Sequence, residues 1–310
     1  MSKDEKIKMQ GTANKLNISM NRLSSSRYSK GDIAFVIICV LVIIICLLPM
    51  VNLLAKSLSG SDYLVKKEVY LLPKGFNVGA YKTVLSDMKY IRAFFWTAFL
   101  TVVGTLLSLT MTILCAYPLI FDKLRGRSLF NIIITITMFF NAGTIPEYLL
   151  MQSLHLLDNP LVLIVPYCLS VFNMIIMRNF FFGIPDSLRE SAEIDGASFF
   201  QILRNIYIPL SKPVIATLAL FYAVGRWNGY SDALMFVKEP KYYPIQLLLY
   251  NIINNINSVD VATQEGFTTP GLSESLKAAV VMFSTIPILC VYPWLQQYFV
   301  AGVSVGAVKE

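Results

Sequence analysis

The sequence predicts an all-α membrane protein that crosses the lipid bilayer six times. Of its 310 residues, 55% are hydrophobic and only 15% are charged, whereas soluble domains carry about a quarter charged residues. The charges also leave long apolar stretches between them, and a helix needs about 20 mainly apolar residues to cross the hydrocarbon core. Because backbone polar groups inside lipid must satisfy one another, these stretches are expected to be helices.

Six stretches are near or above this length. Five contain no Asp, Glu, Lys or Arg, and one is interrupted by Arg226 and Asp232. The first has a long tail before it and exceeds the apolar core of about 7–15 residues that is usual in a cleaved signal peptide, so we expect it to be retained. In chain order the expected spans are 33–55, 93–121, 128–146, 159–177, 213–236 and 278–308.

These spans divide the chain into three parts. We expect a basic tail over 1–32, a six-helix membrane domain over 33–300 and a short C-terminal tail over 301–310. The membrane domain includes one patterned polar connection, 186–209, between the fourth and fifth spans.

The basic residues predict which side of the membrane each connection faces. Lys and Arg gather in the N-terminal tail, around 122–128 and in 178–212, whereas 237–276 has only two. By the positive-inside rule, both termini are therefore expected in the cytoplasm. Connection 56–92 has seven basic residues and opposes this assignment, but the three basic inner segments together outweigh it.

Several functional classes lack their sequence motifs. The chain contains no glycine-rich phosphate loop, no G-x-S-x-G nucleophile elbow and no H-E-x-x-H zinc motif. His155 is the only histidine, so no histidine cluster is available to bind a metal. The net charge of +7 suits contact with anionic lipid, and nothing indicates nucleic acid. We expect neither catalysis nor a bound cofactor or metal in this chain.

The polar connection 186–209 is patterned as a hairpin of two short helices. Ser187 stands three residues before Glu190, and Ser198 stands three before Gln201. Each pair is expected to form a capping box that begins a helix. Between them, the Asp-Gly pair ending at Gly196 allows the left-handed backbone conformation that ends helices.

The second helix of this hairpin is expected to present an apolar ridge. Phe199, Leu203 and Ile206 are spaced by four and three residues, which places them on one helical face. Pro209 is expected to end the helix. The hairpin could simply anchor two spans at the membrane surface. A sharp turn with acidic residues beside it favours instead a protruding element that fits a groove of a partner protein.

Four motifs resemble one family of transport proteins. The hairpin sequence ESAEIDGA at 190–197, followed by PLSKP at 209–213, resembles the EAA signature of permease subunits of ATP-binding-cassette (ABC) importers. Its D-G-A form is similar to that of maltose-type carbohydrate permeases. The stretches 143–159, 221–234 and 298–310 resemble the same family, and within it the subgroup linked to fragments of complex polysaccharides.

The resemblance implies a type I ABC importer permease fold and a multi-subunit assembly in the bacterial cytoplasmic membrane. A homologous second permease would complete the pathway, and two ATPase subunits, which carry ATP and Mg, would bind from the cytoplasm. An extracellular binding protein would deliver the carbohydrate. Ser191 and Leu203 stand where the family usually has Ala and Phe, and both changes keep the size or the apolar character.

Within this assembly the hairpin would couple the ATPases to the membrane helices. The residues that match the motif, and are therefore expected to serve ATPase coupling, are Glu190, Ala192, Asp195, Gly196, Ala197, Phe199, Leu203 and Pro209. The C-terminal tail could be an ordinary frayed end. The resemblance implies instead that it reaches the interface between the ATPases, with Gly302, Gly306 and Val308 as candidate contacts.

Arg226, Trp227 and Asn228 are the candidates for the substrate pathway. An arginine at the centre of a span costs roughly 2.5–3.5 kcal/mol, so Arg226 should face a cavity or the bundle interior and pair with an acid, a carbonyl or a ligand. Aromatic faces suit sugar rings, amides suit hydroxyl groups, and the charge of Arg226 would suit an acidic sugar. Alternatively, Arg226 pairs with the second permease and Trp227 only packs. Gly225 and Gly229 are expected to let a neighbouring helix approach closely.

Two other functional classes remain open. The general EAA pattern is shared with importers of other solutes, such as peptides, although the Asp195-Gly196 and Trp227-Asn228 pairs favour sugar. A membrane-embedded enzyme or scaffold would need convergent ionisable residues, and within the expected spans only Arg226 and Asp232 qualify. The outer connection 237–276 is expected to be a solvated loop. By resemblance, it would face the binding protein.

Overall fold

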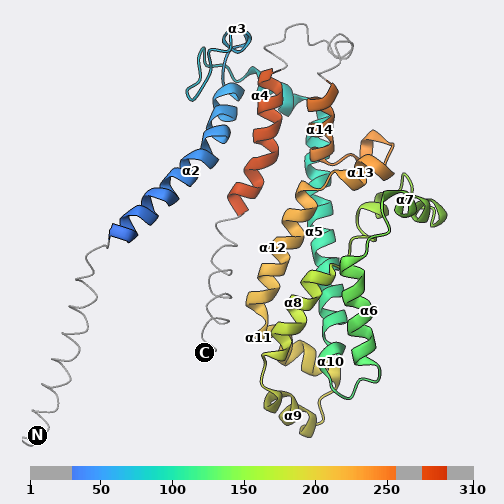
Figure 1. Cartoon of the computed structure of the whole chain (residues 1–310). Helices are drawn as coiled ribbons and strands as arrows, with labels where there is room; N and C mark the ends of the chain where they lie inside the picture. Colours follow the sequence, from blue (N-terminus) through green and yellow to red (C-terminus); the bar gives the residue numbers. More distant parts are fainter. Residues whose placement is uncertain (1–29, 256–273, 292–310) are drawn as a thin grey trace, which may run out of the picture. The chain divides into compact units, whose positions relative to one another are not determined.

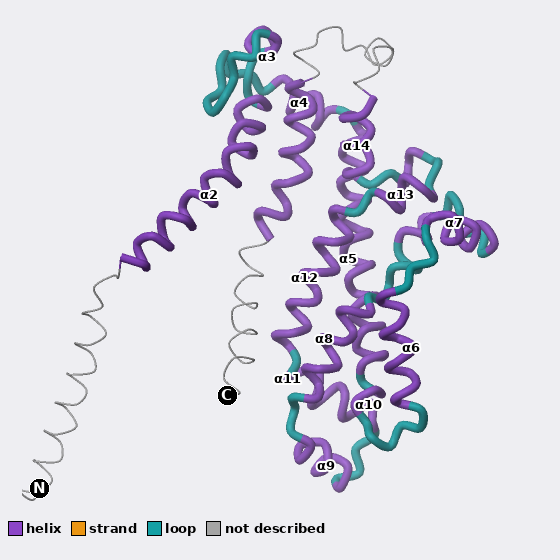
Figure 2. Tube along the Cα trace, viewed as in Figure 1, coloured by secondary structure: helices purple, strands orange, loops and turns teal. Residues whose placement is uncertain are grey.

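The computed structural model describes residues 30–255 and 274–291, and within these ranges every regular element is helical (Figure 2). Residue contacts divide the chain into two units, Met1–Asn52 and Leu53–Glu310. The all-α prediction is therefore confirmed for the described residues. The tail 1–29 and the C-terminal residues 292–310 lie outside them.

The elements keep the order of the predicted spans but are more numerous (Figure 1). In chain order they are α2 (Lys30–Ser57), α3 (Ser61–Val65), α4 (Gly79–Ser86), α5 (Met88–Ala116), the 3₁₀ turn η1 (Pro118–Ile120), α6 (Arg127–Phe139), α7 (Thr144–Ser153), the 3₁₀ turn η2 (Pro160–Leu163), α8 (Val171–Phe182), α9 (Asp186–Ile194), α10 (Phe199–Ile202), the π segment η3 (Leu203–Tyr207), α11 (Ile208–Leu210), α12 (Lys212–Asn228), α13 (Ser231–Phe236), η4 (Pro240–Tyr242), α14 (Ile245–Asn255) and a last helix, Glu274–Val291.

Three helices of the described part are long and apolar enough to cross a membrane. They are Gly31–Ser57, Met88–Ile120 and Glu274–Val291. Two further pairs of helices pass the same test only when the two members of each pair, which meet at a bend, are taken together. These helices agree with an integral membrane protein, but three of the six continuous spans expected from the sequence are interrupted.

The third expected span, 128–146, breaks because turn-forming residues lie inside it. Helix α6 stops at Phe139, and the Asn141 side-chain oxygen then accepts a hydrogen bond from the Gly143 N–H at 2.8 Å. Gly143 has a φ of +90°, which favours glycine. Helix α7 then leaves at an angle of 115° to α6.

The fourth expected span, 159–177, is interrupted by prolines. Asn159 caps the short η2 turn, in which Pro160 occupies the first turn, and Pro166 follows before α8 begins. Ser170 caps α8 by accepting a hydrogen bond from the Asn173 N–H. Because proline lacks an N–H donor and clashes with the preceding turn, hydropathy alone overestimated the continuous helix here.

The fifth expected span, 213–236, ends early. Helix α12 stops at Asn228, the Gly229 backbone is extended, and the separate helix α13 begins at Ser231. The single expected helix is therefore two helices with a break between them. The sequence placed Arg226 near the middle of a span. In the structure, Arg226 lies instead in the last turn of α12.

Helix α5 is the centre of the packing in the larger unit. It contacts α8, α12 and α14, and its buried residues recur every three or four positions along one face. Several of them are small: Ala93, Thr97, Gly104, Ser108, Thr112 and Ala116. Small side chains let neighbouring helices approach closely in a membrane protein. Figure 1 shows α9 and α10 near one end of α5 and α14 near the other.

Candidate functional site

The first helix of the hairpin, α9, begins two residues earlier than the capping pattern predicts. Pro185 is the residue before the first helical position, Asp186, and no side chain caps this end. Ser187 therefore lies inside the first turn, and the predicted capping box with Glu190 is wrong. The fixed φ of Pro185 suits a helix start, and its carbonyl accepts a hydrogen bond from the Leu188 N–H at 3.2 Å.

The turn after α9 is formed as predicted. Gly196 has a φ of +79°, and its N–H donates to the Glu193 carbonyl at 3.1 Å. The Ala197 N–H donates to the Ala192 carbonyl at 2.9 Å. These two bonds make up the Schellman motif that ends a helix. A Cβ atom at Gly196 would meet no atom within 4 Å, so the position needs glycine for its backbone conformation and not for space.

The second helix begins with the capping box that the sequence predicts. The Ser198 hydroxyl accepts a hydrogen bond from the Gln201 N–H at 3.4 Å. In return, the Gln201 side-chain oxygen accepts one from the Ser198 N–H at 2.7 Å. The helix does not end at Pro209 as expected. It runs to Leu210 and bends by 82° into α12 at Ser211.

A π turn explains how Pro209 is tolerated within this helix. In an ordinary α-helix, the proline ring would clash with the carbonyl four residues earlier, that of Asn205. Asn205 lies in the π segment η3, where the helix is wider. We attribute the π segment to this clash.

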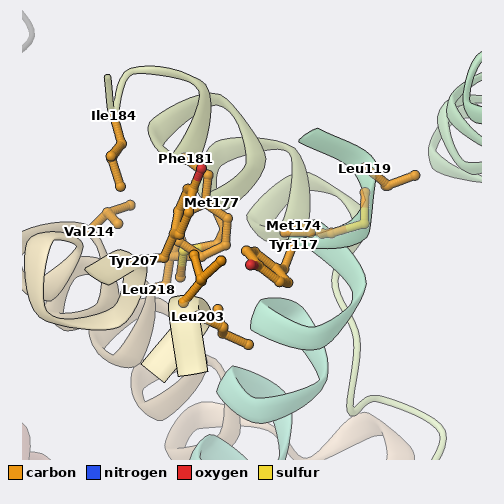
Figure 3. Packing of buried hydrophobic residues seen from close by; sticks show 12 residues of the cluster. Tyr117, Leu119, Met174, Met177, Phe181, Ile184, Leu203, Tyr207, Val214 and Leu218 are labelled. Atoms are coloured by element: carbon orange, nitrogen blue, oxygen red, sulfur yellow. The ribbon is translucent and has the colours of Figure 1, made fainter. Parts of the chain in front are cut away.

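The second helix does not present the single exposed ridge expected from its spacing. Leu203 is only 3% exposed and belongs to a buried cluster with Tyr117, Phe181 and Tyr207. Figure 3 shows these side chains gathered in one core, and the ring centroids of Phe181 and Tyr207 are 5.4 Å apart. Phe199, by contrast, is 64% exposed. Leu203 therefore supports the hairpin from inside.

The outer face of the hairpin combines apolar and acidic side chains. We call it the hairpin surface, and it consists of the exposed residues Glu190, Ile194, Asp195, Phe199 and Phe200. Behind it, Arg189 donates to Glu193 at 2.7 Å and to Asp186 at 3.4 Å. The hydrogen bond that Arg189 donates to Glu193 is the main reason that the pKa of Arg189 is raised. The surface is therefore apolar with the exposed carboxylates of Glu190 and Asp195 at its edge, and Glu190 lies 3.8 Å from an Arg189 nitrogen.

Arg226 forms a nearly buried ion pair at the end of α12. Its guanidinium contacts both carboxylate oxygens of Asp232, at 2.5 and 3.1 Å, and donates to the Leu163 carbonyl at 2.7 Å. The side chains of Arg226 and Asp232 are only 11% and 9% exposed. The pair thus joins α12, α13 and η2. Both residues stood out in the sequence as ionisable residues within one expected span, but their pairing was not predicted.

The glycines near Arg226 make room for its side chain. A Cβ atom at Gly229 would lie 2.9 Å from the Arg226 Nη2 atom, and one at Gly104 would lie 3.7 Å from its Cγ. A Cβ atom at Gly225 would meet nothing within 4 Å. The expected close approach of a neighbouring helix at Gly225 and Gly229 is therefore wrong within the described residues, since Gly225 faces open space and the arginine itself fills the space at Gly229.

Trp227 packs elsewhere, between α12, α5 and the last helix. Trp227 is 7% exposed, donates from its Nε1 to the Ser284 carbonyl at 3.0 Å and meets Phe94 edge-on with centroids 5.6 Å apart. It joins α12 to α5 and to the last helix. Asn228 is exposed. Of the three candidate pathway residues, only Arg226 borders the polar cavity at the end of α12.

That cavity has a volume of about 480 Å³ and is enclosed by several interrupted helices. Its wall includes Gly104 and Ser108 of α5, Asn173 of α8, Tyr222 and Arg226 of α12, and Asp232 of α13. A second cavity of about 260 Å³ lies on another face of α12, and its lining, which includes Ala98, Ala223 and Trp227, is almost entirely apolar. Asn173 and Ser108 were not singled out in the sequence, because no local pattern marks them.

The predicted C-terminal contacts Gly302, Gly306 and Val308 lie outside the described residues, as do residues 256–273 of the outer connection. The structure therefore tests neither prediction.

Comparison with known proteins places these features in a family. The family model described as "Binding-protein-dependent transport system inner membrane component" matches residues 90–305. Protein LplC of Bacillus subtilis (strain 168) is 39% identical over 267 residues, which cover 86% of this chain and 90% of LplC. From the same organism, the polygalacturonan/rhamnogalacturonan transport system permease protein YtcP is 38% identical over 267 residues, with 86% and 93% covered.

A solved structure gives the same result for the fold. A chain of a bacterial ABC transporter involved in the import of the acidic polysaccharide alginate superimposes with a TM-score of 0.81 at 35% sequence identity. The match covers 89% of the present chain and all of the other chain.

Proposed function

Because the chain belongs to the family of binding-protein-dependent transport system inner membrane components, we propose that it is the permease subunit of an importer for oligosaccharides or fragments of polysaccharides. The substrate class rests on the relatives, since YtcP is named for polygalacturonan and rhamnogalacturonan and the related solved transporter imports alginate. These names favour a saccharide over the peptides and other solutes that the general motif also allows. The chain is a transport subunit and not itself an enzyme.

The observation that carries this proposal is the hairpin of α9 and α10. Its turn is fixed by Gly196 and its second helix by the Ser198–Gln201 capping box. Its surface exposes Ile194 and Phe200, at 87% and 66%. Large exposed apolar side chains beside carboxylates suit a groove in a partner protein. We propose that an ATPase subunit supplies this groove and that ATP and Mg bind there, outside this chain.

The proposed assembly and topology follow from the family and from the charges. The chain pairs with a homologous permease, two ATPases bind the cytoplasmic side, and an extracellular binding protein delivers the saccharide. Six spans would place both termini in the cytoplasm of a bacterium, in agreement with the positive-inside rule. The bent pairs α6–α7 and α10–α12 supply spans in this scheme, together with the short helix α8.

Two further contacts are proposed for segments outside the described residues. The C-terminal tail, with Gly302, Gly306 and Val308, would reach the ATPases. Removing residues 302–310 should then weaken ATPase association or regulation. If the ATPase rate and the assembly are unchanged, the tail is an ordinary end.

The outer connection would meet the binding protein, and crosslinking from cysteines introduced at Asn255 and Thr268 can detect this contact. Crosslinks absent in every nucleotide state would contradict this contact.

The hairpin assignment is tested by two substitutions at Gly196. Valine strongly disfavours a φ of +79°, whereas asparagine tolerates the left-handed region. In the complete complex in proteoliposomes, Gly196→Val should therefore abolish most saccharide uptake and saccharide-stimulated ATP hydrolysis. Gly196→Asn, the matched control, should keep both close to wild type.

The amount of complex in the membrane must be measured for both variants. Normal insertion of Gly196→Val with lost coupling would support ATPase docking through the hairpin. Full uptake by the same variant would contradict it.

A further inference from the structure

We propose that the cavity at the end of α12 is a saccharide subsite that binds hydroxyl groups and sugar rings without selecting for charge. This inference rests on the proposed function and adds to it a location and a set of contacts. It differs from the sequence expectation, in which the charge of Arg226 could bind an acidic sugar.

The size and enclosure of the cavity suit one or two sugar units. Its volume of about 480 Å³ lies within the range of small-molecule sites, which are typically about 300–1,000 Å³. Residues from α5, α8, α12 and α13 form its wall, so it is not a groove on one helix. The interruption of the helices around it matters, because irregular backbone at membrane depth is tolerated where it lines a cavity or is buried in protein.

Asn173 provides an unused polar group in this wall. The residue is only 6% exposed, and its backbone N–H is bonded to the Ser170 hydroxyl. Its side-chain amide, however, makes no hydrogen bond to another described residue. Buried polar groups are nearly always paired, so one that is unpaired in a cavity is expected to bind water or a ligand. An amide can both donate to and accept from sugar hydroxyls.

The hydroxyl group of Tyr222, another polar group of the cavity, is already occupied. The Tyr222 hydroxyl is bonded to Thr112 at 2.7 Å and accepts from the Ser170 N–H at 3.1 Å. It therefore holds α12 against α5 and against the start of α8. This contrast makes Asn173, and not Tyr222, the residue that we assign to hydroxyl binding.

Two aromatic side chains in the lining can contact a sugar ring. Tyr167 and Phe221 are 42% and 41% exposed, and both border the cavity. The Tyr167 hydroxyl donates to Glu147 at 2.8 Å, so this bond restrains its ring. A restrained aromatic face beside an amide is the combination that suits the apolar and polar faces of a sugar.

The charges of the cavity cancel. Arg226 and Asp232 are the charged residues of its lining, and they are bonded to each other through both carboxylate oxygens. Arg226 also donates to the Leu163 carbonyl. The Nε atom of Arg226 has no partner but is buried, and Asp232 already neutralises the guanidinium. A sugar carboxylate at this guanidinium would therefore compete with Asp232. Within the described residues the lining therefore offers no free cation to an acidic sugar.

The test compares one saccharide backbone in an acidic and a neutral form, oligogalacturonides and their methyl esters. The complete complex with its binding protein is reconstituted in proteoliposomes, and uptake and stimulated ATP hydrolysis are measured. Asn173→Ala should reduce uptake roughly two- to tenfold, because it removes one hydrogen bond between neutral groups. The reduction should be the same for both probes. Asn179→Ala, at an exposed position of α8, is the matched control and should behave as wild type.

A second pair of variants separates ring contact from the tyrosine hydroxyl. Tyr167→Phe should retain most uptake, whereas Tyr167→Leu should reduce it as much as Asn173→Ala does. Gly225→Phe should block uptake of both probes by filling the cavity, because the space beside Gly225 is open. Ala223→Phe adds the same ring to the apolar cavity of α12 and should affect uptake less.

The outcomes separate this inference from the proposed function. If uptake by Asn173→Ala and Tyr167→Leu equals that of the wild type, the cavity is only a packing defect and the inference fails while the importer assignment stands. If Asn173→Ala impairs only the acidic probe, charge selection is present and the inference also fails. If neither these probes nor other saccharides stimulate the wild-type complex, the proposed function itself fails and the subsite with it.

Discussion

The hairpin and the end of α12 are held together in different ways. In the hairpin, the hydrogen bonds that shape the turn join residues three to five positions apart, such as Gly196 with Glu193 and Ala197 with Ala192. At the end of α12, Arg226 is bonded to Leu163, 63 positions away, and Trp227 to Ser284, 57 positions away. The first region is built from neighbours in sequence, and the second depends on the surrounding fold.

This difference predicts different responses to substitution. Each local bond in the hairpin contributes modestly, so its loss should loosen the hairpin without unfolding the chain. The groups at the end of α12 are buried, and removing one partner leaves the other without compensation. We therefore expect the largest effects in the second region.

The largest effect is expected from Asp232→Ala. This substitution leaves the Arg226 guanidinium nearly buried without its carboxylate, and breaking a buried pair in this way typically costs about 3–5 kcal/mol. The thermal midpoint of the purified complex should fall by several degrees. The variant Arg226→Met should be similarly destabilised, because it leaves Asp232 unpaired.

The double variant Arg226→Met/Asp232→Leu is the control. Since it removes both charges, it should recover most of the lost stability. Wild-type stability in Asp232→Ala would contradict the intrachain pair. Failure of Arg226→Met to associate with the second permease, while this chain remains stable, would instead make Arg226 an assembly residue.

Trp227→Phe should have the next largest effect. It keeps an aromatic ring beside Phe94 but removes the donor to the Ser284 carbonyl, and an unsatisfied buried acceptor costs about 1–3 kcal/mol. The thermal midpoint should fall, and uptake per folded complex should remain near wild type because Trp227 does not line the polar cavity. If Trp227→Phe loses uptake while its thermal midpoint stays normal, Trp227 belongs to the substrate pathway as the sequence suggested.

The capping serines give a smaller and sharper contrast within the hairpin. Ser198→Ala removes a formed cap and should cost about 1 kcal/mol, which corresponds to roughly fivefold faster hydrogen exchange of the amides at the start of α10. Ser187→Ala removes no side-chain cap, so exchange at the start of α9 should change little. Equal effects of the two substitutions would contradict the observed helix start at Asp186.

The smallest effect concerns pH. The Asp158 carboxylate accepts hydrogen bonds from the Glu239 and Lys238 N–H groups, which lower its pKa below the ordinary 3.8. A lowered pKa in the folded state stabilises the fold above pH 3.8, and this contribution is lost as the pH falls through the lowered value. Asp158→Ala should therefore lower the thermal midpoint slightly at neutral pH, and the difference should shrink below about pH 4. A difference that grows in acid would contradict this role.

The same contrast explains what the sequence could predict. Gly196 and the Ser198–Gln201 box were correctly identified because a residue type and a fixed spacing are sufficient for a turn or a cap. The predicted Ser187 cap was wrong because the helix begins after Pro185. The predicted ridge was wrong because Leu203 packs into the buried cluster with Tyr117, Phe181 and Tyr207.

The cavity could not be predicted in the same way. Arg226 is far from Tyr167 and Asn173 in sequence and meets them only because α5 brings α8 and α12 together. Hydropathy located the apolar segments but not their interruptions, although Asn141, Gly143 and Pro166 marked two of these breaks. The ion pair crosses a third break at Gly229, so helical spacing could not have joined Arg226 to Asp232.

The bend at Ser211 makes α12 a lever arm. Its 17 residues extend about 25 Å from the hairpin to the ion pair at its far end. If the helix pivots at Ser211 as a rigid rod, each degree of tilt moves that far end by about 0.4 Å. A tilt of about five degrees would then shift Arg226 by roughly 2 Å, which exceeds the tolerance of its hydrogen bonds to Asp232 and Leu163. Small rotations at the hairpin would in this way be amplified into the making or breaking of bonds at the cavity wall.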